Sequence, residues 1–574
     1  MTEPREFPKR FAVASRDKTS ALAEAIATHV RPGDALHLGA THIRGAAAAW
    51  EILKQFRGTD PGFEIQSLSM STALAPLIHE KLANRVVTTW AGDAYYSPGP
   101  NPVFTRSHAN GVEWRHWSIM TFPQRLQAAA RGLAWTTTKS LKGSDLATDN
   151  AGDIREIDDG LLLIRALTPD VSFFHAPAAD AAGNVLVPPP LLENVWGALA
   201  ARRGAIVTVE KIVDEAIIRE HSSMVKIPRH VVAAVCEVPF GAHPGGVFAR
   251  DIQAITGYGE DYPFWHDMRA ACRNDQVLDA WIREWILDPP DRAAYVDKLG
   301  RDRLKQLTAQ ADPAIVPPYV TDAITAVDFD EEPTPVERAI VAGARLLAER
   351  IETDGLTHML AGAGMSNLAA WLAASECAQA GVDVDLVAEM GLVGYRPQAG
   401  EPFIFNHRNF PSCSMLSDIE TVLGVLMGGA RAKSVAALGA AQIDKRGNLN
   451  TTRIAGRMLM GSGGANDVAT AASCSIVTAT QERDRFVDNV EYITSPGDRI
   501  VAMATTHGVY RKDQGEFVLT AVHDDDLDAG VKAAVEACGW DLRVAPIVEK
   551  VPPPTPSEIR TLRMLDPNGY FRRR

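Results

Sequence analysis

Long apolar runs separated by helical patterns dominate the first half of the chain. Near-continuous apolar stretches occur at residues 161–167, 171–177, 205–213 and 230–239. Such runs indicate parallel strands that are buried on both faces of an α/β sheet. Before them, Thr19–Val30 has the apolar spacing of a helix, and a turn leads from it into the strand pattern Ala35–Ala40. The pattern therefore predicts an open α/β sheet in this half.

The segment from Trp90 to Trp117 breaks the pattern, because aromatic residues alternate there with glycine and proline. This composition predicts a long irregular loop, and long loops in compact domains are often functional. Its polar and aromatic side chains are candidates to line a substrate pocket: Tyr95, Tyr96, His108, Trp114, His116 and Trp117. The alternative is that they pack the loop onto its own domain.

A similar plan starts again in the second half. A helix pattern at 339–349 precedes a short strand pattern at 357–361, a glycine turn and another Ala-rich helix. The motif D-x-x-G-N-aliphatic occurs at Asp180–Val185 and again at Asp444–Leu449. Alone it is a common turn motif, but its presence in both halves suggests an internal duplication.

An acidic stretch with two prolines, Thr321–Arg338, separates the two halves and is the best candidate for a linker. We therefore expect two related open α/β domains, residues 1–322 and 339–574, joined by a linker at 323–338. A site shared by two domains is expected in the cleft between them.

Composition narrows the class of protein. The chain has 574 residues, 46% hydrophobic and 22% charged, as in ordinary globular proteins with more than one core. Its net charge of −13, without a long basic run, argues against nucleic-acid binding. No apolar run approaches the roughly 20 residues of a membrane span, and the N-terminus lacks the apolar region of a signal peptide. A cytoplasmic enzyme is expected, with its six cysteines reduced and with no metal-type spacing.

One carboxylate stands out in the second half. Alternating apolar residues from Val382 to Ala388 lead to Glu389, and Gly391 and Gly394 follow. A carboxylate at the end of an apolar strand is only partly hydrated, so it can act as a nucleophile. The adjacent glycines allow a bulky ligand to approach the backbone. A Glu that ends a strand before a glycine turn more often has a structural role, so this stretch alone does not decide the matter.

Two further stretches bear on the chemistry, AAQIDKRGNLNTT (440–452) and GSGGAND (461–467). The glycine-dense turn precedes an Ala-rich segment, and its backbone N–H groups can surround an oxyanion or a phosphate. The turn lacks the Lys-Ser/Thr of a P-loop and the spacing of a dinucleotide fingerprint.

Together with DRFVDNVEYITSPG (484–497), GAHP (241–244) and the stretch 283–304, these motifs resemble family I coenzyme A transferases. The resemblance is to proteins similar to glutaconate CoA-transferase, and it covers nearly the whole chain. Those enzymes usually have separate alpha and beta chains. Here the first half resembles the alpha chain and the second half resembles the beta chain, so the two look fused. The resemblance implies the CoA-transferase fold.

By this resemblance Glu389 is the catalytic glutamate, with Met390 where the family commonly has Asn or Ser. The implied reaction moves CoA from an acyl-CoA donor to a carboxylic acid acceptor, by a ping-pong mechanism through a glutamyl-CoA thioester. CoA and acyl-CoA are then substrates, no cofactor is permanently bound, and a homodimer or homotetramer is expected.

The resemblance also suggests oxyanion- or CoA-binding residues. These are the backbone of Gly463, Gly464 and Ala465, and the side chains of Gln442 and Asn448. The two amides bind substrate or merely shape the D-x-x-G-N turn. Weaker candidates for the substrate pocket are Gly39, Ala40, His116, Trp117 and Arg408, the last of which can pair with a carboxylate or a CoA phosphate. His243 is interpreted as a turn residue rather than a general base.

Two alternatives to transfer remain. The first is a thioester or ring-opening hydrolase on the same fold, in which Glu389 activates water; the substitution at Met390 keeps this open. The second is a ligand sensor without catalysis, but the sequence has no helix-turn-helix segment and no basic face to support it.

Overall fold

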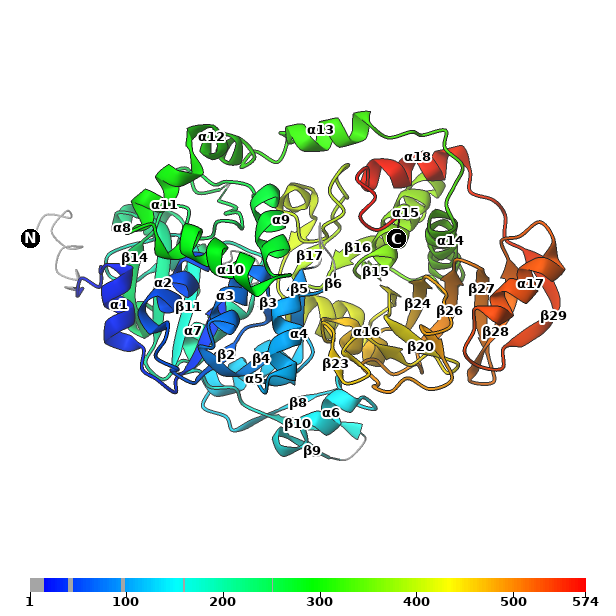
Figure 1. Ribbon diagram of the computed structural model, residues 1–574, viewed down its shortest axis with the longest axis horizontal. Coiled ribbons are helices and arrows are strands. Elements are labelled where there is room, and N and C mark those ends of the chain that lie inside the picture. The colour runs from blue at the N-terminus through cyan, green and yellow to red at the C-terminus, as the bar shows by residue number, and fades with distance from the viewer. Residues whose placement is uncertain (1–14, 40–44, 94–98, 158–159, 250, 574) are drawn as a thin grey trace, which may run out of the picture.

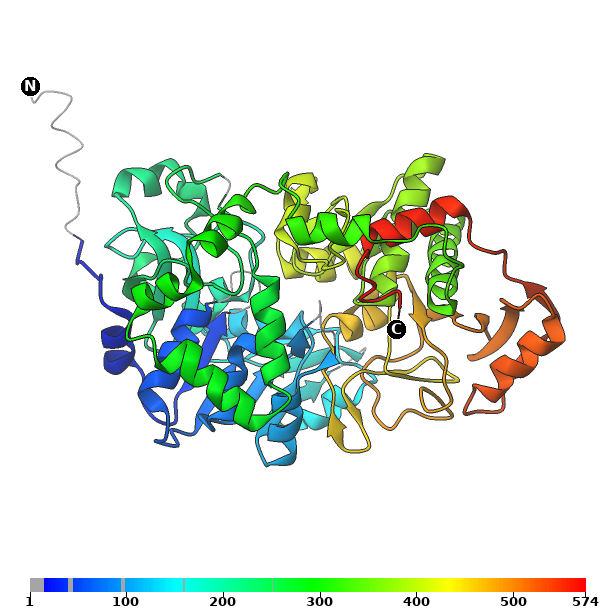
Figure 2. The ribbon, with the colours of Figure 1, turned by 45° about the horizontal axis from the view of Figure 1, so that its top comes forward.

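The computed structural model describes residues 15–39, 45–93, 99–157, 160–249 and 251–573. Two layered α/β units lie side by side, as two views of the ribbon show (Figure 1 and Figure 2). The first unit, formed by the described residues before Pro318, is coloured blue to green, and the second, formed by those after Thr325, is coloured green to red. The chain passes from one to the other along one edge of the molecule, through α12 (Arg301–Ala309) and α13 (Pro318–Thr325).

The first unit contains a mostly parallel sheet. Its strands are, in spatial order, β14 (Val232–Glu237), β13 (Ala205–Ile212), β11 (Val171–Ala179), β1 (Ala35–Gly39), β2 (Phe63–Gln66), β4 (Ala83–Thr88) and β7 (Glu113–His116). A short strand, β12 (Val185–Leu186), pairs antiparallel with the end of β11. Every residue of β11 is buried, which explains its nearly unbroken apolar sequence.

Helices cover this sheet. Apolar residues of α2 (Ala46–Phe56) pack with β1, β2 and α9 (Tyr262–Ala271) in one core, and α7 (Glu193–Ala200) packs on β11 and β13 in another. The other helices of this unit are α1 (Leu22–His29), α3 (Ala75–His79), α4 (Pro102–Ala109), α5 (Thr121–Ala130), α6 (Asp145–Asp149), α8 (Glu215–Glu220), α10 (Asp275–Ile282) and α11 (Arg292–Leu299).

The second unit contains the longer sheet. Its strands are, in order, β18 (Met415–Leu416), β17 (Leu392–Val393), β16 (Asp385–Ala388), β15 (His358–Leu360), β19 (Ser434–Leu438), β24 (Cys474–Ala479), β26 (Ile500–Thr505), β27 (Gly508–Asp513), β28 (Glu516–Val522) and β29 (Arg543–Lys550). Its helices are α14 (Pro335–Asp354), α15 (Met365–Ala380), α16 (Ala465–Ala471), α17 (Leu527–Glu536) and α18 (Pro556–Leu565). A π-helix spans Glu420–Met427.

The two sheets share one strand order. The series β14-β13-β11-β1-β2 in the first unit corresponds to β26-β24-β19-β15-β16 in the second, and all neighbours in both series are parallel. Each series begins along the chain with helix, strand, helix, strand: α1, β1, α2, β2 and α14, β15, α15, β16. The prediction of two related open α/β units is confirmed, and the shared order supports an internal duplication.

The repeated D-x-x-G-N motif forms the same turn in both units. The backbone N–H and side-chain amide of Asn184 donate to the Asp180 carboxylate at 2.9 and 2.6 Å. Asn448 makes the same two bonds to Asp444, at 3.0 and 2.9 Å. The glycine before each Asn has a positive φ, +94° and +86°, which favours glycine. These turns connect β11 to β12, and β20 (Gln442–Asp444) to β21 (Leu449–Asn450).

The segment from Trp90 to Trp117 is more regular than its composition predicted. It contains α4, β7 and the short strands β5 (Trp90–Asp93) and β6 (Gly99–Pro100). The prediction of an irregular loop was wrong because Asn101 caps α4: its side chain accepts the Val103 N–H at 2.9 Å, and proline occupies the first helical position. Tyr95 and Tyr96 lie outside the described residues.

The apolar run 161–167 is not part of the parallel sheet. It forms β10 (Leu162–Arg165), which pairs antiparallel with β8 (Trp135–Thr138) and β9 (Ile154–Glu156) in a small separate sheet. Leu162 and Ile164 are buried, whereas Leu163 and Arg165 are not. This alternation is typical of an antiparallel sheet with one covered face.

The predicted linker, residues 323–338, overlaps the end of α13 and the start of α14, which begins at Pro335. The domain ranges 1–322 and 339–574 stay a prediction.

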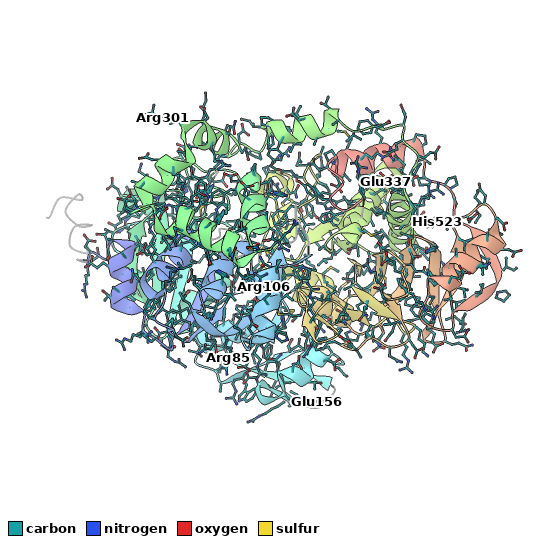
Figure 3. The ribbon with its side chains drawn as sticks, viewed as in Figure 1. Arg85, Arg106, Glu156, Arg301, Glu337 and His523 are labelled. Carbon is teal, nitrogen blue, oxygen red and sulfur yellow. The ribbon has the colours of Figure 1, made fainter. Side chains whose placement is uncertain are left out.

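Away from the contact between the units, Arg85 on β4 pairs with Glu64 on β2 at 3.0 Å and with Glu113 on β7 at 2.6 Å. Figure 3 shows Arg85 on the first unit and Glu337 and His523 on the second. The two ion pairs of Arg85 join residues that lie in register across three strands at the surface.

Among the described residues, no helix is long and apolar enough to span a membrane.

Candidate active site

Glu389 directly follows β16, whose last three residues are buried. β17 pairs back onto β16, so the chain reverses at once. Gly391 permits this reversal: its φ is +100°, and a Cβ there would lie 2.8 Å from the carbonyl carbon and oxygen of Ser417. As a whole residue, Glu389 is partly exposed. The strand and the glycine turn are those that the sequence predicted.

The glycine-rich stretch 461–467 lies against this carboxyl group. Gly464 precedes α16, and its backbone N–H hydrogen-bonds to Glu389. A Cβ on Gly464 would lie 1.9 Å from Oε2 of Glu389, well inside contact distance. Only glycine at this position therefore permits the observed approach.

The same stretch is held by the backbone of the first unit. Gly463 donates its N–H to the Thr89 carbonyl at 3.0 Å and accepts the Ile119 N–H at 3.1 Å. This differs from the expectation that the Gly463 amide is an oxyanion donor, because that amide is already engaged. The amide of Gly464 is the one directed at the carboxyl group.

Two aromatic rings of the first unit flank the glycines. A Cβ on Gly461, whose φ is +104°, would lie 2.5 Å from Nδ1 of His116. A Cβ on Gly463 would lie 3.3 Å from Cε3 of Trp90. Trp90 also forms a bridge with Gly461. The glycine stretch therefore lies at the contact between the two units.

Asp467 extends this contact from α16. Its buried carboxylate accepts the Met120 N–H at 3.1 Å. Burial raises the pKa of Asp467 to about 6, although the nearby polar groups of Ser118, Ser140 and Met120 act to lower it. Asp467 thus holds α16 against the start of α5.

The two carboxyl groups influence each other. Burial raises the pKa of Glu389 to about 8, and the negative charge of Asp467 contributes to the rise, whereas the Gly464 N–H lowers it. Desolvation and a like charge both disfavour the ionised form. A strongly perturbed carboxyl group beside a backbone donor is a candidate for catalysis.

A second contact between the units lies beside the Glu389 turn. Leu191 of the first unit donates its N–H to the Ser417 carbonyl at 2.8 Å. Ser417 in turn donates its N–H to the carbonyl of Gly391 at 2.8 Å. The turn that carries Glu389 is therefore braced by the first unit through one intermediate residue.

Gly39 lies at the end of β1 and lines small cavities on the first-unit side. One of them extends along residues 190 and 192–194, which adjoin Leu191. That Gly39 faces a substrate stays a prediction. Ala40 lies outside the described residues.

Gln442 and Asn448 use their side chains within their own hairpin and to join it to neighbouring segments. Gln442 donates to the Asp484 carbonyl at 3.0 Å and accepts from the Asn450 amide at 3.1 Å. Besides its bonds to Asp444, Asn448 accepts the Gly497 N–H at 2.9 Å. Of the two alternatives, the geometry favours a structural role for both.

His116 and Trp117 are buried rather than exposed to an open pocket. Trp117 is 1% exposed, and the guanidinium of Arg125 lies 3.7 Å from its ring centroid. This corrects the expectation that Trp117 lines a substrate pocket: it belongs to a core beneath α5. Burial lowers the pKa of His116 to about 3, so this ring is neutral where it packs on Gly461.

Arg408 is buried and pairs with Glu401 at 3.4 Å. It lines a cavity of about 950 Å³ between the end of α12 and the segment 398–412. The neutral polar residues on the same wall are Gln253, Thr256, Thr308, Gln398 and Ser412. Glu389 and the glycine stretch are not among its lining residues, so the structure does not bring Arg408 together with them.

His243 is buried in a polar cluster of the first unit, 2.6 Å from the Tyr295 hydroxyl and 3.0 Å from the Asp261 carboxylate. These contacts give it a structural role, in agreement with its interpretation as a turn residue. No group of His, Cys, Asp and Glu in the described part of the chain is arranged to hold a metal ion.

Sequence reasoning missed Asp467, although it ends the GSGGAND motif. The sequence did carry a signal, because Asp467 is the one carboxylate in the Ala-rich segment that follows Gly464. Sequence reasoning also missed Thr89, Ile119 and Met120, which act through their backbone groups. No side-chain pattern reveals such contacts.

The motifs and the duplicated fold have counterparts among known proteins. A family model described as coenzyme A transferase matches residues 19–238 and 414–520. The chain belongs to the coenzyme A transferase family. It is thus an enzyme that transfers CoA, as the sequence motifs predicted.

Relatives of this coenzyme A transferase include both chains of one two-chain enzyme, 3-oxoadipate CoA-transferase from Pseudomonas knackmussii. The first of them is 29% identical over 49% of this protein and 98% of its own length. The second is also 29% identical, over 32% of this protein and 78% of its own length. One chain of glutaconate CoA-transferase from Acidaminococcus fermentans is 28% identical over 50% of this protein and 94% of its own length. Similarity to both types of chain confirms that the two halves are fused here.

The fold agrees with this assignment. The acyl-CoA transferase YdiF from Escherichia coli O157:H7 superposes with a TM-score of 0.65 at 16% identity. The match covers 94% of this chain and 96% of YdiF. At this identity the match shows the CoA-transferase fold alone.

Proposed function

We propose that this transferase moves CoA from an acyl-CoA donor to a carboxylic acid acceptor through a covalent thioester on Glu389. Family membership supports the transfer of CoA. The observation that carries the residue assignment is the contact between Glu389 and Gly464. It combines a carboxyl group whose pKa is raised by burial with a backbone donor at the contact between the two units.

The reaction follows from the nucleophile. A Glu389 carboxylate oxygen attacks the donor's thioester carbonyl, the C–S bond breaks, and CoA leaves as a thiolate. The product is a mixed anhydride on Glu389. The thiolate then attacks the glutamyl carbonyl, which releases the donor's carboxylate and leaves CoA on Glu389 as a thioester. An acceptor carboxylate reverses both steps, so that CoA ends on the acceptor.

Gly464 has a defined part in this sequence. When the thiolate attacks the glutamyl carbonyl, negative charge develops on the glutamyl oxygen itself. In the resting enzyme the Gly464 N–H already hydrogen-bonds to the Glu389 carboxyl group. The same amide then stabilises the tetrahedral oxyanion, a contribution of about 3 kcal/mol in comparable sites. The thiolate is thereby directed to the carbonyl that Gly464 polarises.

The ionisation of Glu389 suits this chemistry. Its pKa of about 8 makes the carboxylate a more basic nucleophile than a hydrated glutamate. As a consequence, Glu389 is mostly protonated near neutral pH, and only the ionised fraction is a nucleophile.

The partners follow from the reaction. The substrates are an acyl-CoA and a carboxylic acid, and CoA resides on the enzyme only as an intermediate. We further propose a cytoplasmic location, where acyl-CoA is available, and a homo-oligomer built from the fused chain. Nothing in the acidic composition favours a nucleic-acid partner.

Intact mass spectrometry after incubation with a panel of acyl-CoAs tests the proposal. The expected result is an enzyme–CoA adduct that borohydride reduction converts to a modified residue, mapped to Glu389 by peptide sequencing. Glu389→Ala forms no adduct. A matched control is Glu536→Gln, an exposed glutamate at the end of α17, which forms the adduct like the wild type.

The same experiment separates transfer from hydrolysis. A hydrolase cleaves the thioester without an adduct and without need of an acceptor acid, and its product carries oxygen from labelled water. That outcome overturns the proposal and assigns Glu389 to the activation of water.

A further inference from the structure

We propose that Asp467 is a positioning residue that couples the docking of the first unit to the orientation and charge of Glu389. The inference rests on the proposed role of Glu389 as the nucleophile. It adds a second carboxylate to the site, one that does not itself react with CoA.

The helix geometry joins Asp467 to the nucleophile. Gly464 and Asp467 are three residues apart at the start of α16, so they lie on the same face of the helix. Gly464 holds Glu389 through its N–H and leaves no room for a side chain between them. A shift of α16 therefore moves the backbone donor and the second carboxylate together, relative to Glu389.

The first unit fixes this part of α16. Met120 donates its N–H to Oδ2 of Asp467 at 3.1 Å. Next to Asp467, the side-chain oxygen of Asn466 accepts the Leu141 N–H at 2.8 Å. Gly463 makes two backbone hydrogen bonds of its own to the first unit. Three residues of the stretch, Gly463, Asn466 and Asp467, are thus anchored on the first unit, while Glu389 belongs to the second.

The groups that face Asp467 come from several elements. Glu389 faces it from the end of β16, and the hydroxyls of Ser118 and Ser140 and the N–H groups of Ile119 and Met120 face it from the first unit. Among the described residues, Asp467 is the one charged group found to act on Glu389. Hydrogen-bond donors of the first unit therefore hold a negative charge beside the nucleophile.

This arrangement has a consequence for reactivity. A fixed negative neighbour keeps the Glu389 carboxyl group basic, which strengthens it as a nucleophile and as the acyl partner of CoA. If the first unit moves away from α16, Asp467 loses its hydrogen bond from Met120. The Asp467 carboxylate then no longer has a fixed position beside Glu389. A functional nucleophile is then present only when the two units are docked.

The test compares Asp467→Asn with the wild type in the pH dependence of kcat/KM for an acyl-CoA donor. Asn matches Asp in shape and still accepts the Met120 N–H, but it carries no charge. The acid limb of the profile is expected to move to lower pH by about one unit, because the like charge that raises the pKa of Glu389 is gone. Asp528→Asn, an exposed aspartate on α17, keeps the wild-type limb.

A second variant covers the case in which Asp467→Asn does not fold. Asp467→Glu keeps the charge and moves it by one methylene. Its acid limb is expected to stay at the wild-type pH while kcat falls at least about tenfold, because the carboxylate no longer meets Met120 in the same geometry. An acid limb of Asp467→Glu that moves to lower pH by about one unit, although the charge is kept, contradicts the proposal.

The outcomes separate this inference from the proposed function. If the wild type forms no adduct at Glu389, the proposed function fails and this inference falls with it. If the adduct forms and Asp467→Asn lowers kcat/KM equally at every pH, Asp467 is only structural. In that case the inference is overturned while the transferase mechanism stands.

Discussion

The backbone of Gly464 meets the carboxyl group of Glu389 so closely that a methyl group does not fit between them. The ideal Cβ position on Gly464 is 1.9 Å from Oε2 of Glu389. Glu389 belongs to a strand of the second unit, whereas the glycine stretch is clamped on the first. The nucleophile and its backbone donor therefore share one small space that depends on both halves of the chain.

Gly464→Ala is expected to lower kcat by at least about a hundredfold, since the added methyl group displaces Glu389 from its donor. The fold should persist, because the long Glu389 side chain can rotate away. Steady-state kinetics with an acyl-CoA donor, together with circular dichroism, check both expectations. Gly152→Ala is the matched control, because nothing lies within 4 Å of a Cβ there. Equal activity of the two variants would contradict the assigned contact.

The acid limb of catalysis is expected to reflect Glu389. Since burial and Asp467 raise its pKa to about 8, kcat/KM for the acyl-CoA donor should rise with pH and level off above about pH 8. Only the ionised carboxylate attacks the thioester. Measurements from pH 6 to pH 9.5 with one donor test this. A profile that is flat across this range would mean that Glu389 is ionised throughout.

Removing the carboxyl charge should stabilise the fold at alkaline pH. The pKa of Glu389 is raised from 4.5 to about 8 in the folded chain, so the folded state binds the proton more tightly than the unfolded one. Wild-type stability contributed by the protonated group is complete below about pH 4.5 and is lost as pH rises through about 8. Glu389→Gln carries no such loss, so its advantage in unfolding temperature should grow over that range.

Differential scanning calorimetry at pH 5, 7 and 9 measures this advantage, with Glu536→Gln as the control for loss of an exposed carboxylate. The control should differ from the wild type by a small amount that does not change with pH. If the unfolding temperature of Glu389→Gln is equal to or below that of the wild type at pH 9, Glu389 is not desolvated as described.

Much of the fold was accessible from the sequence because buried parallel strands have a simple signature. β1, β11 and β13 were found as apolar runs, since residues on both faces of these strands are buried. The repeat was accessible because the D-x-x-G-N turn needs an Asp, an Asn and a glycine at fixed positions. The failure at Trp90–Trp117 has a local cause, because Gly99 and Pro100 form a short strand and Pro102 begins α4.

The candidate site was accessible only in part. Glu389 and Gly464 have sequence signals, a strand that ends in a carboxylate and a glycine-dense turn. Their juxtaposition and the clamp by Thr89 and Ile119 depend on backbone groups, which every residue type carries. For the same reason the importance of Asp467 emerges only when its partners on the first unit are known.

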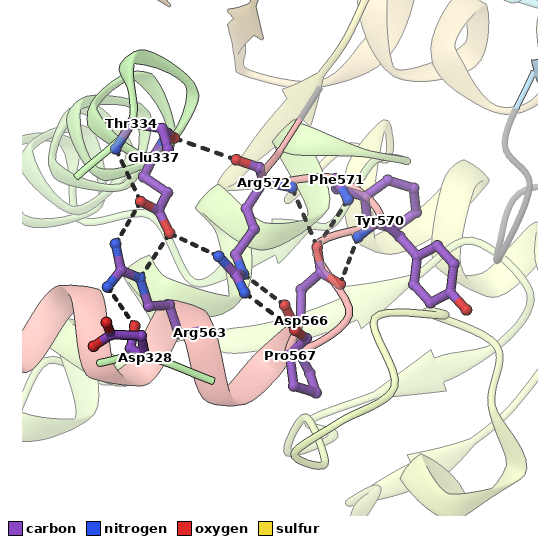
Figure 4. Close-up of polar contacts among 9 residues, drawn as sticks. All are labelled: Asp328, Thr334, Glu337, Arg563, Asp566, Pro567, Tyr570, Phe571 and Arg572. Atoms are coloured by element: carbon purple, nitrogen blue, oxygen red, sulfur yellow. Dashed lines mark hydrogen bonds and ion pairs between the residues drawn. The ribbon is translucent and has the colours of Figure 1, made fainter. Parts of the chain in front are cut away.

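A buried charge cluster around Glu337 attaches the C-terminal segment to the rest of the second unit. The sequence motifs did not reveal it. Figure 4 shows Glu337 at the start of α14, between two arginines of the C-terminal segment. Arg563 donates to both carboxylate oxygens at 2.9 Å, and Arg572 donates to one at 3.2 Å. Thr334 and Glu337 also form a capping box. The last residues of the chain thereby hold the first helix of this unit.

Glu337→Gln is expected to lower the free energy of unfolding by about 3–5 kcal/mol, because it leaves two buried guanidinium groups without their carboxylate. Burial acts to raise the pKa of Glu337, but the hydrogen bonds from Arg563 outweigh it and the pKa lies below 4.5. The stabilisation from this group is therefore present above about pH 4.5 and is lost as pH falls below its depressed pKa.

Urea unfolding at pH 7 measures this loss, and Glu349→Gln on the same helix supplies the control. Glu349 pairs with Arg511 at 2.7 Å, but both side chains are nearly half exposed, and such surface pairs contribute less than about 1 kcal/mol. The kcat of folded Glu337→Gln should equal that of the wild type, because the cluster stabilises α14 without touching the Glu389 turn. If both variants lose the same free energy of unfolding, the C-terminal segment is not anchored through Glu337. Its attachment must then come from the apolar packing of α18 on α14 and α15.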